Sequence, residues 1–227
     1  EEKSLLLDEG VILSASSALT NPRKRLTAEI AWLPGLGPKR ASEAVMQIGK
    51  KSDKIFGQDN IPALSRANLL AAGLKVRAEE ADRYEISEWI IKLAKVFDEI
   101  DQEAVLGEVN EEREISGFTT ITDQHALEGE IDSRRKYYRS VIRDALNHLS
   151  SSDLVEVITE TVESVTDMGN MPAPLLIYNL VDTYEVEAQD FLDKEESNID
   201  ELLQRIRSFS DSGSSDTALG RVVDELI

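Results

Sequence analysis

Apolar residues recur at every third or fourth position through most of this 227-residue chain. Between residues 84 and 100, the apolar positions that follow this rule are Ile86, Trp89, Ile90, Leu93, Phe97 and Ile100. Because an α-helix turns once in about 3.6 residues, this spacing places the apolar side chains along one face. The same spacing returns at 127–149, at 154–165 and beyond residue 174. The sequence therefore predicts an all-α fold, a multi-helix bundle with a small N-terminal helical hairpin region.

Only residues 117–122 resemble a strand, and we interpret so short a segment as a connector. We expect an N-terminal helical region with a hairpin motif at residues 1–75 and an acidic helical bundle at 76–209. Because residues 210–215 are rich in Ser and Gly, we expect a linker followed by a short C-terminal helix over 210–227.

The charge balance and the missing cysteines exclude several classes of function. Lys and Arg total 25 against 44 Asp and Glu, a net charge of −19. Such a chain is no general nucleic-acid coat, and binding to an anionic membrane surface is not expected. Without cysteine, the chain has no disulfide, thiolate metal site or cysteine nucleophile. Neither histidine, His125 or His148, stands three residues after a glutamate, as di-metal helical bundles require. We expect no catalytic residues, no metal and no cofactor.

Positive charge is concentrated in one segment. Residues 21–54 contain eight basic and three acidic residues, a net charge of +5, whereas the chain from Ile55 onward carries −21. A basic patch beside an acidic body steers the approach of a charged partner. The alternative is that these bases simply face solvent on short helices.

Inside this basic segment, residues 32–45 read Trp-Leu-Pro-Gly-Leu-Gly-Pro-Lys-Arg-Ala-Ser-Glu-Ala-Val. A Pro-Gly-Leu-Gly turn between two amphipathic stretches, with a small alanine in the second, resembles a helix-hairpin-helix element. That family binds the DNA backbone without reading its sequence. The resemblance implies phosphate binding by N–H groups at Gly35 and Gly37, with Lys39 and Arg40 adding positive charge. The alternative is an interhelical turn closed by a glycine cap, which needs these residues for packing alone.

The segment before the turn carries a second resemblance. Residues 18–25, Ala-Leu-Thr-Asn-Pro-Arg-Lys-Arg, resemble the end of helix III in J-domain co-chaperones, and the string as far as residue 35 is similar to divergent bacterial DnaJ-like proteins. Asn21 or Thr20 is suited to cap a helix that begins at Pro22. The chain contains no His-Pro-Asp, and too few residues precede Ile12 for the family's helices I and II. The family's stimulation of a chaperone ATPase is therefore assigned to no residue of this chain.

Negative charge gathers toward the end of the expected bundle. The acidic residues of this run are Asp182, Glu185, Glu187, Asp190, Asp193, Glu195, Glu196, Asp200 and Glu201. On a helix they form either a solvated face or a docking surface for a basic protein partner. For the docking surface we single out Asp182, Glu185, Asp190 and Asp193.

Two further patterns bear on packing. Arg135, Arg139 and Arg143 recur every four residues, and we expect them to pair with the acidic helix across the bundle in preference to holding phosphates. Trp32 and Trp89 both fall on apolar faces, and we expect both to anchor the core.

Taken together, these patterns favour a non-enzymatic α-helical protein-interaction module, an adaptor or a co-chaperone-like protein derived from a J-domain, which docks a protein partner through its acidic bundle. The alternative function is a helix-hairpin-helix module that binds the DNA backbone through residues 32–45. No apolar stretch approaches the length of a membrane span, and a cytoplasmic location is expected.

Overall fold

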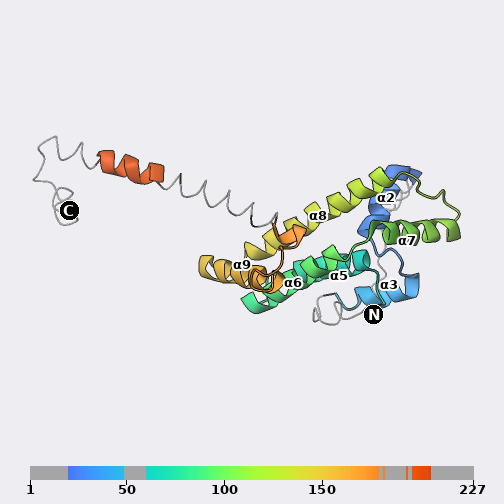
Figure 1. Ribbon diagram of the computed structural model, residues 1–227, viewed down its shortest axis with the longest axis horizontal. Helices are drawn as coiled ribbons and strands as arrows, with labels where there is room; N and C mark the ends of the chain where they lie inside the picture. Colours follow the sequence, from blue (N-terminus) through green and yellow to red (C-terminus); the bar gives the residue numbers. More distant parts are fainter. Residues whose placement is uncertain (1–19, 49–59, 179–180, 182–192, 194–195, 206–227) are drawn as a thin grey trace, which may run out of the picture. The chain divides into compact units, whose positions relative to one another are not determined.

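The computed structural model describes residues 20–48, 60–178, 181, 193 and 196–205 (Figure 1). Every regular element among these described residues is a helix, which confirms the all-α fold. The chain divides into two compact units, Glu1–Leu180 and Val181–Ile227. Among the described residues of the first unit, the helices are α2 (Pro22–Ala31), α3 (Pro38–Val45), α5 (Ala63–Arg77), α6 (Arg83–Asp98), α7 (Gln102–Ile115), α8 (Gln124–Leu146) and α9 (Ser151–Val165). Residues 175–178 are helical as well. In the second unit, residues 196–205 are helical.

The boundary between the two units falls after Leu180, whereas the sequence suggested boundaries near residues 75 and 209. Residue 75 lies inside α5, and α5 packs against both α6 and α8. The regions expected on either side of residue 75 therefore share one core. The boundary expected near residue 209 lies outside the described residues.

Side-chain caps set where most of the helices begin. Asn21 accepts the backbone N–H groups of Arg23 and Lys24 at 3.0 and 3.2 Å, and Pro22 occupies the first helical position, as the sequence predicts. The caps of α6, α7, α8 and α9 are Asp82, Asp101, Asp123 and Ser150. Each cap satisfies N–H groups that the first helical turn leaves unpaired.

The core of the first unit is built around α5, which packs between α6 and α8. Ten of its fifteen residues are buried, so this helix is covered on nearly every side. The apolar face predicted for α6 is confirmed for Ile86, Trp89, Ile90, Leu93 and Phe97, which are all buried. The sixth predicted member, Ile100, lies beyond the end of α6 and is partly buried. On the outer side of α6 lies α9, and α2 packs on α8.

The two tryptophans take opposite positions. Trp89 is fully buried against Gly73 of α5, where an added Cβ would lie 2.4 Å from the ring. The prediction for Trp32 is wrong, because its side chain is 58% exposed. Trp32 is the residue that ends α2, so the helical spacing that carries Leu26 and Ile30 into the core does not extend to it.

Residues 117–122 connect α7 to α8 and form no strand, as expected. Gly117 takes a φ of +74°, and the N–H of Phe118 donates to the carbonyl of Arg113 at 2.7 Å. This left-handed glycine with its backward hydrogen bond closes the C-terminus of α7.

Candidate functional site at the hairpin turn

The turn between α2 and α3 has the geometry of a tight helical hairpin. Gly35 takes a φ of +77°, a backbone conformation that glycine adopts without strain. Leu33 and Leu36 on either side of it are buried, and so is the small Ala41 in α3. Because these three side chains are buried, the hairpin packs against the rest of the first unit.

The N–H of Gly35 is already bound within the protein. It donates to Oε1 of Glu112, on α7, at 2.9 Å. The Cβ position of Gly35 lies 3.1 Å from the Glu108 side chain and 2.8 Å from Cγ of Pro62. The donor that the sequence assigns to a phosphate therefore holds a carboxylate, and α7 covers this side of the turn.

Burial makes these carboxylates unusual acids. Glu108 is half-buried, and its Oε2 has no hydrogen-bond partner among the described residues. Burial and the neighbouring Glu112 raise the pKa of Glu108 to about 7. Burial also raises the pKa of Glu112, although its hydrogen bond from Gly35 acts in the opposite direction. A phosphate at Gly35 would lie beside two carboxylates, which disfavours an anion there.

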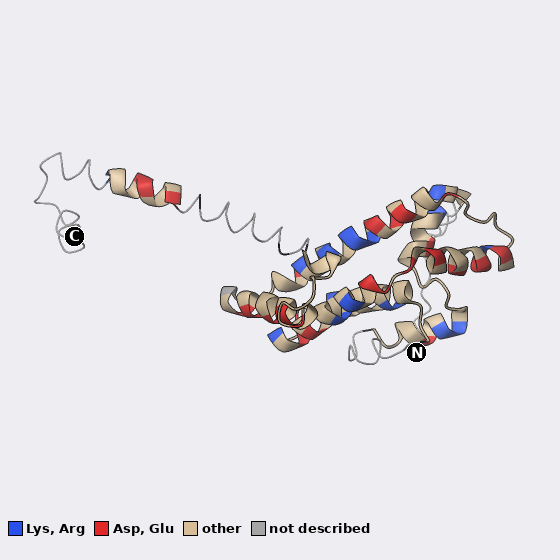
Figure 2. Cartoon of the chain, viewed as in Figure 1, with Lys and Arg blue, Asp and Glu red and all other residues tan. Residues whose placement is uncertain are grey.

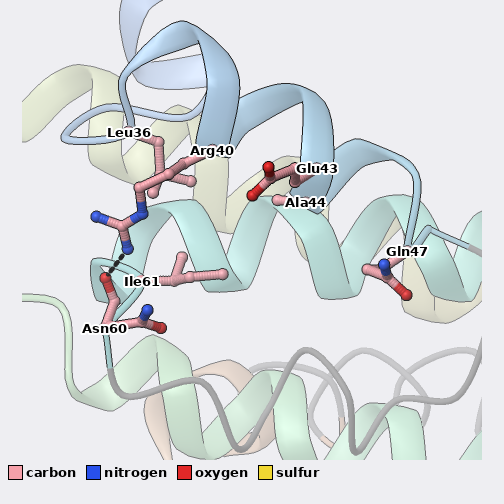
Figure 3. Close-up of a pocket in the computed structure, with 7 residues that line it drawn as sticks. All are labelled: Leu36, Arg40, Glu43, Ala44, Gln47, Asn60 and Ile61. Carbon is pink, nitrogen blue, oxygen red and sulfur yellow. Dashed lines mark hydrogen bonds between the residues drawn. The ribbon is translucent and has the colours of Figure 1, made fainter.

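The other three residues of the predicted DNA site lie on the exposed side of the hairpin. Gly37 and Lys39 are exposed at the start of α3. Arg40 is exposed as well, and its guanidinium donates to the carbonyl of Asn60 (Figure 3). Phosphate binding therefore stays a prediction for Gly37, Lys39 and Arg40. The N–H of Gly35 does not contribute to it, because that group is bound to Glu112.

A small cavity of about 230 Å³ lies beneath α3 (Figure 3). Its lining is mixed in polarity and consists of Leu36, Arg40, Glu43, Ala44, Gln47, Asn60 and Ile61. With Arg40 turned to a backbone carbonyl and Glu43 on the same helix, the cavity presents no cluster of free cations to an anion.

A buried polar network fixes the hairpin to α5 and α8. The amide nitrogen of Asn68 donates to the carbonyls of Ile30 and Trp32 at 3.0 and 2.6 Å, at the end of α2. Its amide oxygen accepts from the hydroxyl of Tyr138 at 2.7 Å and from Nε of Arg134 at 3.0 Å. Every hydrogen-bonding group of Asn68 is thus used. Asn68 is not among the residues predicted from the sequence, where its only signal is an Asn within the apolar run of α5.

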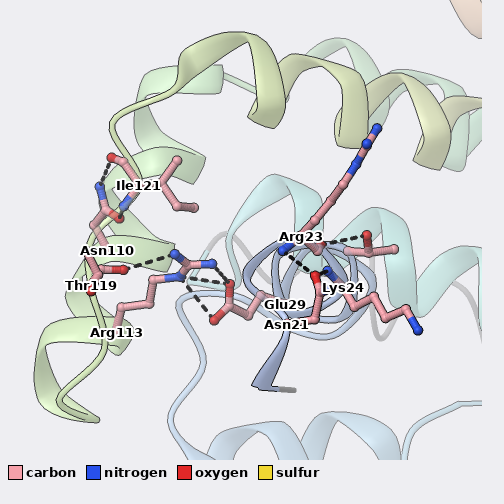
Figure 4. Close-up of polar contacts among 9 residues, drawn as sticks. Asn21, Arg23, Lys24, Glu29, Asn110, Arg113, Thr119 and Ile121 are labelled. Carbon is pink, nitrogen blue, oxygen red and sulfur yellow. Dashed lines mark hydrogen bonds and ion pairs between the residues drawn. The ribbon is translucent and has the colours of Figure 1, made fainter. Parts of the chain in front are cut away.

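An ion pair ties α7 to α2 in the same region (Figure 4). Nε and Nη2 of Arg113 lie 3.0 and 2.6 Å from Oε2 of Glu29, and Nη1 donates to the carbonyl of Thr119 at 3.0 Å. Asn110 and Ile121 exchange two hydrogen bonds across the α7–α8 connector. These contacts hold the carboxylates of α7 against the hairpin.

The acidic residues singled out as a docking surface are described only in part. Asp182, Glu185 and Asp190 lie outside the described residues, while Asp193 is helical and exposed. Within the helix 196–205, three large apolar side chains are exposed, at 54% for Ile199, 57% for Leu202 and 42% for Leu203. The acids on this helix are Glu196, Asp200 and Glu201, all exposed. Whether the acidic run pairs with the arginines of α8 stays a prediction.

The described fold and site define an all-helical bundle whose hairpin turn is closed by carboxylates. Comparison of the chain with protein-family models, curated proteins and solved structures finds no match. Within the described residues, no group of three acidic or histidine side chains is placed to hold a metal ion. None of the described helices is long and apolar enough to cross a membrane.

Proposed function

We propose that this chain is a non-enzymatic helical interaction protein, whose acidic helix 196–205 docks into an apolar groove rimmed by lysine or arginine on a partner protein. The observation that carries the proposal is the exposure of Ile199, Leu202 and Leu203 within the helical residues 196–205. Their spacing of three, four and one places them on a single face, in the manner of helices that bind grooves.

Charge defines the class of partner. Glu196 and Asp200 lie beside the apolar face, whereas Glu201 lies on the other side of the helix, 3.7 Å from Arg205 in the next turn. A groove with basic residues at its rim complements these carboxylates, and the apolar side chains supply most of the affinity. A co-chaperone-like or adaptor role for the J-domain-like residues 18–25 belongs to the same proposal and assigns no residue to catalysis.

DNA binding by the hairpin is the alternative function. The hydrogen bond from Gly35 to Glu112 and the contact with Glu108 count against it, because both carboxylates repel a phosphate. Protein binding is therefore the function that the geometry favours.

The test is affinity capture with the full chain, followed by reconstitution with the purified captured partner and calorimetric titration. Leu202→Asp is expected to weaken reconstituted binding by at least about tenfold, as substitution at an interface anchor does. Ile115→Asp is the matched control, because Ile115 is an exposed apolar residue in the first unit and carries the same change. Equal affinity of the Leu202→Asp variant and the wild type would overturn the proposal.

The DNA alternative has its own arm. Fluorescence anisotropy of a labelled duplex is measured with the full chain over a salt series. The proposal expects no binding at low salt. Binding that falls with salt and is lost in the Lys39→Glu, Arg40→Glu variant would favour the hairpin as a DNA site instead.

A further inference from the structure

The second half of α8 contains a markedly basic stretch of sequence. Positions 134–143 hold five bases and no acid, in a chain whose net charge is −19. Figure 2 shows these basic residues following one another along α8. Two of the five are used inside the fold: Arg134 binds Asn68, and Arg135 lies 3.1 Å from Asp132.

The other three define the α8 basic stripe: Lys136, Arg139 and Arg143. Their side chains make no hydrogen bond or ion pair with any described residue. Lys136 and Arg143 are exposed, and Arg139 is half-buried. None of the acids that the structure describes pairs with these three neighbouring cations.

The stripe occupies the outer face of α8. Its residues are three and four positions apart, so they lie on one side of the helix. Tyr138, Ile142 and Ala145 are buried on the opposite side, where α8 packs on α5 and α6. At about 1.5 Å of rise per residue, the stripe carries three positive charges along about 10 Å of helix.

We infer that the α8 basic stripe docks an acidic α-helical segment of a partner protein. Carboxylates spaced three and four residues apart on one helix repeat at the same interval as Lys136, Arg139 and Arg143, so two helices side by side bring each cation opposite an acid. This surface is opposite in charge to the helix 196–205 and is independent of the function proposed for that helix.

A helical segment fits this surface better than a nucleic acid does. The Debye length is about 10 Å at 0.1 M salt, so a short acidic helix on the stripe is screened from the more distant acids of the chain. A nucleic acid is a long polyanion and extends past the stripe onto those acids. The local positive charge therefore favours a short acidic segment.

The test uses a fluorescein-labelled, alanine-rich helical peptide with glutamates at intervals of three and four, titrated with the full chain at about 0.1 M salt. A second peptide carries glutamine in place of every glutamate. We expect the Glu peptide to bind and the Gln peptide not to bind. The variant Lys136→Glu, Arg139→Glu, Arg143→Glu is expected to lower affinity for the Glu peptide at least about tenfold, because three charge-assisted contacts become repulsive.

The matched control is Lys24→Glu, Lys75→Glu, Lys95→Glu, which changes the net charge equally at three exposed positions on other helices, α2, α5 and α6. It is expected to bind the Glu peptide like the wild type. Circular dichroism melts check that both variants fold. Should the stripe variant fail to fold, the single substitution Arg143→Gln is tested instead, because Arg143 is exposed. It is expected to lower affinity for the Glu peptide about threefold.

Three results would overturn the inference. The first is equal loss in the stripe variant and the matched control, which would make the effect one of net charge. The second is no binding of the Glu peptide, and the third is displacement of that peptide by duplex DNA at lower concentration than by unlabelled peptide. Sedimentation velocity tests whether a second copy of the chain occupies the stripe. If the wild type forms dimers and the stripe variant is monomeric, the occupant is the chain itself and not a partner protein.

Discussion

Gly35 and Glu112 lie 77 positions apart in the sequence and are joined by a hydrogen bond of 2.9 Å. The contact places a carboxylate where a glycine turn of this kind offers its N–H to an anion. The anion that the hairpin binds is thus supplied by α7 of the same chain.

Two substitutions of Glu112 distinguish the contribution of its hydrogen bond from that of its charge. Glu112→Gln keeps an oxygen that accepts from the N–H of Gly35, whereas Glu112→Ala leaves that half-buried donor unpaired. We expect the Gln variant to exceed the Ala variant in free energy of unfolding by about 1 kcal/mol. Urea denaturation at neutral pH measures this difference. Equal stability of the two variants would show that the hydrogen bond contributes nothing.

Gly35→Ala is expected to lower the free energy of unfolding by about 2 kcal/mol or more. The new Cβ would combine a φ of +77° with an approach of 2.8 Å to Pro62. Gly117→Ala is the control, because Gly117 has a similar φ of +74° and nothing within 4 Å of the added carbon. Gly117→Ala is expected to lower the free energy of unfolding by about 1 kcal/mol, which is the cost of the positive φ without a steric contact. If both substitutions cost the same, the contact with Pro62 is without effect.

The carboxyl of Glu108 makes stability depend on pH near neutrality. Its pKa is about 7 in the folded chain, against 4.5 as its ordinary value, so the folded state binds the proton more tightly. The stabilisation is complete below pH 4.5 and is lost as the pH rises through 7. After allowance for solvent screening, we expect a decrease of about 1–2 kcal/mol over this range.

Glu108→Gln isolates this effect from the titration of its neighbour Glu112. The variant is expected to be more stable than the wild type at pH 8, and the difference shrinks toward pH 5. Denaturant unfolding at several pH values measures it. Parallel pH profiles for the two proteins would assign the dependence to other groups.

Asn68 joins three helices, and its loss is expected to be costly. Asn68→Ala leaves the carbonyls of Ile30 and Trp32 and the hydroxyl of Tyr138 without this partner. We expect a loss of about 3 kcal/mol in the free energy of unfolding. Tyr138→Phe removes one hydrogen bond only, at about 1 kcal/mol. The double variant completes a cycle, and strictly additive losses would contradict the network.

Local patterns in the sequence predict the elements of this fold, because their causes are local. The apolar spacing of α6, the cap at Asn21 and the glycine turn each depend on residues within a few positions of one another. Trp32 is misplaced because the spacing rule does not say where a helix ends. Glu112, Asn68 and Arg113 escape prediction for a different reason: each contacts partners between 36 and 84 positions away, and no short pattern records such distances.

The same distances have a consequence for how the hairpin forms. Its turn is held by Ser65 of α5, which donates to the carbonyl of Pro34 at 2.7 Å, as well as by Asn68 and Glu112. All three lie later in the chain than the turn itself. During synthesis, the hairpin therefore emerges before the residues that hold its turn, and contacts of such separation carry the entropic cost of closing a long loop. A peptide of residues 20–48 would contain the sequence of the motif but would lack Ser65, Asn68 and Glu112, which hold the turn in its conformation.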